Sequence, residues 1–159
     1  MSASFREAVE ATRGLESAYQ QGLQALRSRD RGHVEPEDPR CLSGSVDIDS
    51  AYAALEPNAH RWDYAIGYRH TDRSGEVVYW VEMHTASDGE TGRVIDKARW
   101  LLAWFGRSGT ALGCFERDIV WVSSGSTHLT PTAPQKKVMA TLGLRQVGGQ
   151  LRIPSRRNR

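Results

Sequence analysis

The chain has 159 residues, of which 39% are hydrophobic and 25% are charged, and its formal net charge is +2. This length and composition fit one globular domain that buries a real core. No apolar run approaches the roughly 18 residues of a membrane span, so no membrane partner is expected. The N-terminus has no signal pattern, and the two cysteines have no zinc-ligand spacing, so we expect a cytoplasmic protein with reduced thiols.

The charge is distributed unevenly along the chain. No acidic residue follows Asp118, whereas seven lysines and arginines do, so the first 118 residues carry −5 and the remainder carries +7. A basic end of this kind can mark a surface for nucleic acid or for an acidic partner. A solvated helix face followed by a frayed tail is the alternative interpretation.

The first quarter of the chain predicts a long helix followed by a loop. Ser4 and Glu7 have the spacing of a capping box, and apolar residues then recur every three to four positions. We therefore expect one amphipathic helix that ends near Arg27. Segment 28–40 is charged, contains two prolines and shows no periodicity, so it is predicted to be a loop.

The middle of the chain predicts a strand, a short helix and a hairpin. Residues 42–48 alternate as in a strand, and Asp49 is expected to cap a short helix beyond it. Asp47 and Asp49 could also supply an extra carboxylate to a site. Two apolar-rich segments, 62–70 and 76–85, flank a polar turn and predict a β-hairpin.

The second half of the chain predicts two helices and two strands. Apolar spacing indicates a strong helix over 92–105 and a second helix that ends near Leu142. The apolar segment 118–123 is predicted to be a buried strand, and 150–153 to be a last short strand. Segment 154–159 is basic and is expected to be disordered.

These elements together predict the fold class. The order of strands and helices favours a single α/β (α+β) domain over residues 1–153, in which helices flank a central mixed β-sheet. The wholly apolar stretch 119–122 is expected to be a central strand with a parallel neighbour.

The hairpin carries the sharpest functional signal. A tight turn at residues 72–75 would place Asp63 opposite His84, and alternation would put Asp63, Glu82 and His84 on one face. Such neighbours lie about 5–7 Å apart, which suits one divalent cation, Mg²⁺ or Mn²⁺, that could orient a phosphodiester and activate water. The alternative is a polar cluster on an exposed sheet face or a satisfied hydrogen-bonded cluster.

The predicted αβββαβ order, with an acid on the second strand and an acid-x-base tripeptide on the third, resembles the PD-(D/E)xK nuclease superfamily. The likeness covers residues 4–123. It implies that Asp63 is the metal-binding acid, that Glu82 is the second acid, and that His84 stands where a lysine is usual. A histidine there could serve as a ligand or as a general base.

The resemblance also implies accessory residues. Some members carry the lysine on the next helix, where Lys97 is the candidate. A first-helix acid often assists, for which Glu7 and Glu10 are candidates. Independently of the resemblance, basic residues of the later helices and strands could hold phosphates, namely Arg93, Lys136, Lys137 and Arg145. Ordinary surface charge is the alternative interpretation of these residues.

The activity implied is metal-dependent hydrolysis of phosphodiester bonds in DNA repair, restriction or defence. DNA is favoured over RNA as the partner, and a protein partner or a homodimer is a further candidate. One alternative is an inactive member of the same fold that binds nucleic acid or assembles through Trp100 and Trp104. Another is an RNA-binding protein without a metal. A serine nucleophile in segment 123–128, beside His128, is the weakest candidate.

Overall fold

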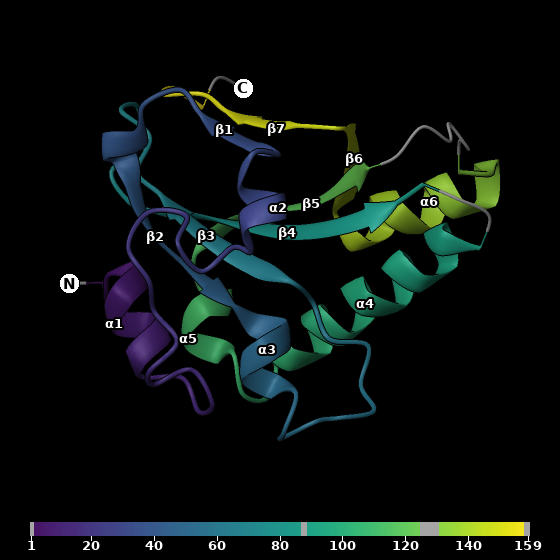
Figure 1. Cartoon of the computed structure of the whole chain (residues 1–159), viewed down its shortest axis with the longest axis horizontal. Helices are drawn as coiled ribbons and strands as arrows, with labels where there is room; N and C mark the ends of the chain where they lie inside the picture. The colour runs from purple at the N-terminus through teal and green to yellow at the C-terminus, as the bar shows by residue number, and fades with distance from the viewer. Residues whose placement is uncertain (1, 87–88, 125–130, 158–159) are drawn as a thin grey trace.

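A five-stranded mixed sheet with the order β2-β3-β4-β5-β6 forms the centre of the molecule (Figure 1). The computed structural model describes residues 2–86, 89–124 and 131–157. The predicted single α/β domain with a central mixed sheet is confirmed. The five strands are β2 (Leu42–Asp47), β3 (Tyr64–Tyr68), β4 (Val77–Thr85), β5 (Glu116–Ser124) and β6 (Leu144–Gly148).

The sheet combines an antiparallel half with a parallel half. β2, β3 and β4 pair antiparallel, whereas β5 runs parallel to β4 on one side and to β6 on the other. The apolar stretch in β5 is therefore an internal strand with parallel neighbours, as predicted. The helices are α1 (Phe5–Glu10), α2 (Ser28–Arg31), α3 (Ile48–Tyr52), α4 (Glu90–Phe105), α5 (Thr110–Gly113) and α6 (Ala133–Leu142), with a 3₁₀ turn η1 (Pro39–Cys41).

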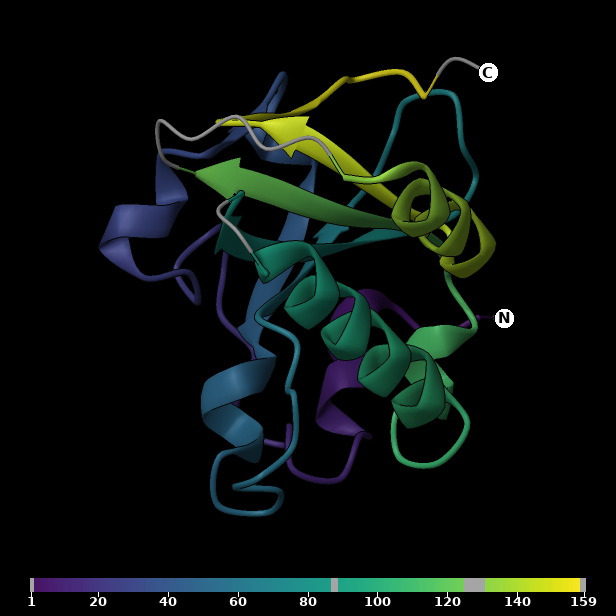
Figure 2. The ribbon, with the colours of Figure 1, turned by 90° about the vertical axis from the view of Figure 1, so that its right-hand side faces the viewer.

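The two faces of the sheet are covered differently. Side chains from α1, α3, α4, α5 and α6 pack on one face, where α4 and α6 lie side by side (Figure 2). The other face is covered by a short parallel pair, β1 (Val34–Pro36) and β7 (Leu151–Ile153), which lies above β4 in Figure 1. Apart from the short elements α2, β1, η1, α3 and α5 between them, α1, β2, β3, β4, α4 and β5 follow the order αβββαβ.

The predicted long first helix is wrong beyond α1. The helix stops at Glu10, and Gly14 adopts a left-handed backbone with φ +90°. Beyond it, Leu15 enters the helix-covered core whereas Leu26 enters the opposite core. The regularly spaced apolar residues of this segment therefore pack into two separate cores and do not form one face of a helix. Segment 28–40 is likewise not a plain loop, because it forms α2, β1 and η1.

The pairing of β3 with β4 differs from the predicted register by two residues. Tyr64 pairs with Val81, so Asp63, which directly precedes β3, lies opposite Glu82 instead of His84. The strands end earlier than predicted because the connection over 69–76 is tied to other parts of the chain. Since the difference is an even number, the same face of each strand still carries the same side chains.

The C-terminal segment lies against that connection. The Thr71 amide donates to the Ser155 carbonyl at 2.8 Å, and the Arg157 amide donates to Asp72 Oδ1 at 2.8 Å. Residues 154–157 of the segment expected to be disordered are therefore held by defined hydrogen bonds, whereas 158–159 lie outside the described residues. The final strand β7 is present as predicted, although it pairs with β1 and not with the main sheet.

Candidate active site

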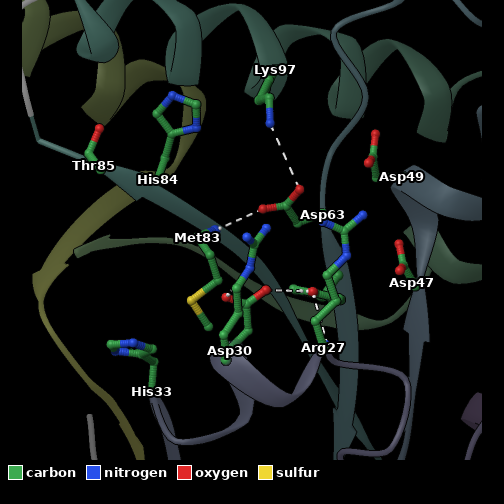
Figure 3. A pocket seen from close by; sticks show the side chains of 12 residues that line it. Arg27, Asp30, His33, Asp47, Asp49, Asp63, Met83, His84, Thr85 and Lys97 are labelled. Carbon is green, nitrogen blue, oxygen red and sulfur yellow. Dashed lines mark hydrogen bonds and ion pairs between the residues drawn. The ribbon is translucent and has the colours of Figure 1, made fainter. Parts of the chain in front are cut away.

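Two acidic side chains and one basic side chain meet where β4 passes beneath α4, and Figure 3 shows two of them, Asp63 and Lys97. Asp63 comes from the residue before β3, Glu82 from β4 and Lys97 from α4. Glu82 follows Val78 and Trp80 on the face of β4 that packs against the helices. Strand alternation therefore directs the carboxylate of Glu82 toward α4, where Lys97 points down to meet it.

Glu82 is the buried centre of this group. Its side chain has no exposed surface. Its Oε1 accepts a hydrogen bond from the Asp63 amide at 3.1 Å, and its Oε2 accepts one from Lys97 Nζ. His84 Nδ1 lies 3.5 Å from the same Oε2. A buried carboxylate needs partners of this kind because water cannot solvate it.

Asp63 lies beside Glu82 and nearer to solvent. Its Oδ2 accepts a hydrogen bond from the Met83 amide at 3.0 Å, and its Oδ1 lies 3.8 Å from Lys97 Nζ. Burial, together with the negative charge of Glu82, raises the pKa of Asp63 to about 8, although Lys97 opposes the shift. This carboxyl group therefore holds a proton at neutral pH.

Lys97 remains a cation in this environment. Burial alone would lower the pKa of its ammonium, but the charges of Glu82 and Asp63 outweigh burial and raise that pKa above its usual value. The resemblance assigns a lysine to water activation. With a raised pKa, Lys97 is better suited to donating hydrogen bonds to an oxyanion than to removing a proton.

His84 is held between two carboxylates. Its Nδ1 faces Glu82, and its Nε2 bonds to Glu90 at the start of α4. The hydrogen bond to Glu82 raises the pKa of the imidazole, with a further contribution from Glu90, against the effect of burial. The imidazolium form therefore persists to higher pH than usual, which disfavours a role as base or metal ligand.

A cavity of about 450 Å³ opens beside Asp63 and Lys97. Its lining carries both signs of charge. The acidic groups include Asp47, Asp49 and Asp63, and the basic groups include Arg27, Arg29 and Lys97. Figure 3 shows Asp63 and Lys97 on one side and Arg27, Asp30 and His33 on the opposite side. A mixed lining of this kind suits a ligand that carries negative charge and is held together with a cation.

The two candidate acids of α1 lie elsewhere. Glu7 closes the capping box with Ser4, and Glu10 forms an ion pair with Arg6 at 2.7 Å. Neither residue lines the cavity. The acids near Asp63 are instead Asp47 and Asp49 at the junction of β2 with α3.

Asp47 and Asp49 already have local partners. Asp47, and not Asp49 as predicted, caps α3 by accepting from the Ser50 amide at 2.9 Å. Asp49 forms an ion pair with Arg61 at 2.9 Å. In the sequence, this part of the cavity was indicated by two aspartates that stand two residues apart at the end of a predicted strand.

None of the four predicted phosphate-binding residues lines the cavity. Lys136 and Lys137 are exposed on α6, and Arg145 pairs with Asp118 at 2.9 Å. Arg93 is exposed and pairs with Glu90, the partner of His84. Arg27 and Arg29 were not predicted as site residues, because a long helix and a loop were predicted where they occur.

Asp63 and Glu82 are the residues that could hold a metal ion. Within residues 2–86, 89–124 and 131–157, no three histidine, cysteine, aspartate or glutamate side chains are grouped to hold one. Magnesium nevertheless often binds through one or two carboxylates, with water and substrate phosphate as its other ligands. Asp63, which lines the cavity, and Glu82, which is buried directly beside it, provide two such carboxylates. The candidate His128 lies outside the described residues.

No helix among the described residues is both long and apolar enough to span a bilayer. Comparisons of the chain with protein-family models, with curated proteins and with solved structures find no match, so the case for a function rests on the geometry of the site.

Proposed function

We propose that this protein hydrolyses phosphodiester bonds in nucleic acid with Mg²⁺ or Mn²⁺ as its cofactor, as the resemblance to PD-(D/E)xK nucleases implies. The observation that carries the proposal is the meeting of Asp63, Glu82 and Lys97 beside a charged cavity. These residues are far apart in the sequence and come from three different elements. The resemblance assigns the same three positions to an acid, a second acid and a helix-borne lysine, with DNA favoured over RNA.

The electrostatics of the two acids support a cation beside them. Asp63 has its pKa raised to about 8, because it is buried next to a second carboxylate. A divalent cation would relieve that repulsion and favour the ionised form of Asp63. Asp63 and Glu82 would hold such an ion, which would supply Lewis acidity and lower the pKa of a water ligand.

The remaining groups have roles that follow from their contacts. Lys97 presents a permanent positive charge to the cavity, where it can donate to a phosphate oxygen and stabilise the charge that develops in the transition state. His84 is a positioning residue, because it touches Glu82 on one side and Glu90 on the other. It fixes the orientation of the Glu82 carboxylate relative to α4.

An inactive relative that only binds nucleic acid is the second candidate. The observation in its favour is that the Lys97 ammonium already neutralises Glu82. In that case Lys97 would serve to stabilise the fold, and the basic groups of the cavity would bind a phosphate without hydrolysis.

Cleavage assays separate the two candidates. Labelled single-stranded and duplex DNA and RNA would be incubated with Mg²⁺, Mn²⁺ or EDTA. We expect cleavage that needs the metal and that falls at least 100-fold in Asp63→Asn, Glu82→Gln and Lys97→Met. Arg99→Gln, on the exposed side of α4, is the matched control and should retain activity.

Two results would remove the hydrolytic proposal. One is the absence of cleavage by the wild-type protein with either metal. The other is equal cleavage by the wild type and Glu82→Gln, since this would point to a contaminating nuclease. Thermal melts of each variant would establish that any loss of activity does not come from unfolding.

A further inference from the structure

The cavity has a second wall that the resemblance does not account for. This wall comes from the segment that joins α1 to β1 and includes the start of α2. Arg27 and Arg29 contribute its positive charge. In Figure 3 the Arg27 side chain extends from this wall toward the side that carries Asp63 and Asp49. A group bound beside Asp63 would therefore have a guanidinium on its opposite side.

Arg27 differs from the other charged groups of the cavity because its guanidinium has no partner among the described residues. Within the described parts of the chain, no ion pair and no side-chain hydrogen bond involves its guanidinium. Arg29 has only a distant contact, 3.8 Å, with Asp30. The other charged groups are engaged, Asp30 with Tyr64, Asp47 with Ser50, Asp49 with Arg61 and Lys97 with Glu82.

Tyr64 joins the two walls. Its ring is buried in β3, directly after Asp63 in the sequence. Its hydroxyl donates to Asp30 Oδ2 at 2.6 Å and accepts from the Arg27 backbone amide at 3.2 Å. The backbone that carries Arg27 is therefore fixed to the strand whose preceding residue is the candidate catalytic acid. Such an anchor holds the two walls at a constant separation.

We propose that Arg27 is a phosphate-positioning residue that binds the substrate backbone across the cavity from Asp63, with Arg29 assisting it. This inference rests on the proposed function, since it names the group that holds the phosphodiester at the same site. A guanidinium suits the role, because it donates two parallel hydrogen bonds to phosphate oxygens. Phosphate contacts of this kind fix the position of a nucleic acid and carry no sequence information.

Binding of an oligonucleotide tests the inference without requiring hydrolysis. The probe is a fluorescein-labelled single-stranded DNA of about 12 nucleotides, titrated with the full chain in EDTA and monitored by anisotropy. Arg27→Gln should weaken binding about 5- to 10-fold and lower the slope of log affinity against log salt by about one unit. Arg27→Lys should lose less affinity than Arg27→Gln, since lysine keeps the positive charge but cannot donate the two parallel hydrogen bonds of a guanidinium.

Arg40→Gln is the matched control. Arg40 is 90% exposed, pairs with Asp38 and lies outside the cavity, and its removal changes the net charge by the same amount. We expect it to change affinity less than twofold. Equal effects of Arg27→Gln and Arg40→Gln would overturn the inference, because they would show a general charge effect. A wild-type protein that does not bind the probe would overturn it as well.

The inference and the proposed function can fail separately. Suppose that the wild type binds DNA, that Arg27→Gln binds it more weakly than Arg40→Gln does, and that no metal supports cleavage. The phosphate-binding role of Arg27 is then supported, and the hydrolytic proposal is rejected. If the wild type cleaves DNA with Mn²⁺ and Arg27→Gln keeps both the DNA affinity and the cleavage rate, the hydrolytic proposal is supported and the phosphate-binding role of Arg27 is rejected.

Discussion

The ammonium of Lys97 donates a hydrogen bond to Oε2 of Glu82 from a helix that crosses over the strand carrying the acid. The Glu82 side chain is fully buried, whereas that of Lys97 is 20% exposed. The pair thus has one end in the core and one end at the cavity. Its charges balance each other locally, and each side chain supplies the partner that the other needs where water is excluded.

Lys97→Met should destabilise the fold while Glu82 is left in place. The substitution removes the only lysine or arginine that contacts this buried carboxylate within the described residues, and a loss of about 3 kcal/mol in the free energy of unfolding is expected. The double variant Glu82→Gln/Lys97→Met should recover part of that loss, because the unpaired charge is gone. Urea denaturation measures both values.

Arg99→Met provides the matched comparison on the same helix. Arg99 pairs with Asp96 at 3.4 Å, and both side chains are at least half exposed. Its loss should cost less than about 1 kcal/mol, as is usual for surface pairs. Similar losses in Lys97→Met and Arg99→Met would contradict the view that burial makes the Glu82 pair special.

The stability of the protein should fall as the pH rises through the range in which Asp63 titrates. Its pKa is about 8 in the fold, against 3.8 for the unconstrained carboxyl, so the native state binds an extra proton between those values. Stability decreases with pH wherever the native state binds more protons than the unfolded state. We therefore expect a decline between about pH 4 and pH 8, measured by urea midpoints across that range.

Two variants separate the contributions of Asp63 and His84 to this pH dependence of stability. Asp63→Asn keeps an oxygen that can accept from the Met83 amide and should flatten the curve. His84 contributes with the same sign. Its pKa is raised in the fold, so its contribution to stability is complete below about pH 6.5 and is lost as the pH rises above that value. His84→Gln should remove only that smaller part. An unchanged slope in Asp63→Asn would show that Asp63 is ionised throughout.

The shared face of Asp63 and Glu82 could be predicted because strand alternation has a period of two residues. The predicted pairing was displaced, yet the displacement was an even number and kept both acids on the face toward α4. The displacement itself could not be foreseen. It arises because the connection after β3 bonds to Ser155 and Arg157, which lie more than 80 residues away.

The wall of the cavity that carries Arg27 could not be predicted for a similar reason. Val34 is placed by its pairing with Leu151, and Arg27 by the hydroxyl of Tyr64. Contacts between distant segments leave no local periodicity in a sequence. The position of Lys97 was accessible only through the resemblance, since helical spacing alone indicates a face and not the strand beneath it.

Gly67→Ala should test the packing of Phe5 in α1 against Gly67 in β3. A Cβ at this position would lie 2.6 Å from Cγ of Phe5, whose ring is fully buried. The ring must shift, and a loss of about 1–3 kcal/mol is expected. A Cβ at Gly75 meets nothing within 4 Å, so Gly75→Ala is the control and should stay within about 0.5 kcal/mol. Equal melting temperatures for the two variants would exclude this packing.

Tyr64→Phe should loosen the wall that carries Arg27 without emptying the core. It removes a hydroxyl that bonds at 2.6 Å to Asp30 and at 3.2 Å to the Arg27 amide, at a cost of about 1–3 kcal/mol. Affinity for single-stranded DNA should fall as well. Tyr68→Phe, on the same strand, loses contacts of 3.3 and 3.4 Å with Asp38, which lies outside the cavity, and its DNA affinity should be unchanged.

Binding of a divalent cation should release a proton from Asp63. With a pKa of about 8, the carboxyl is about nine-tenths protonated at pH 7, and a metal ion binds only the ionised form. We expect close to one proton released per Mn²⁺ at pH 7 and almost none at about pH 9.5. Calorimetric titration of MnCl₂ in two buffers with different ionisation enthalpies measures this number.

The other titratable groups at the site predict different outcomes, which makes the proton count diagnostic. A proton from Lys97, whose pKa in the metal-free site lies above the usual value, would disappear in Lys97→Met. A proton from His84 would disappear in His84→Gln but persist in Asp63→Asn. Release that is abolished in Asp63→Asn and retained in His84→Gln assigns the proton to Asp63. Tight Mn²⁺ binding without any proton release would mean that the ion does not bind at this carboxylate.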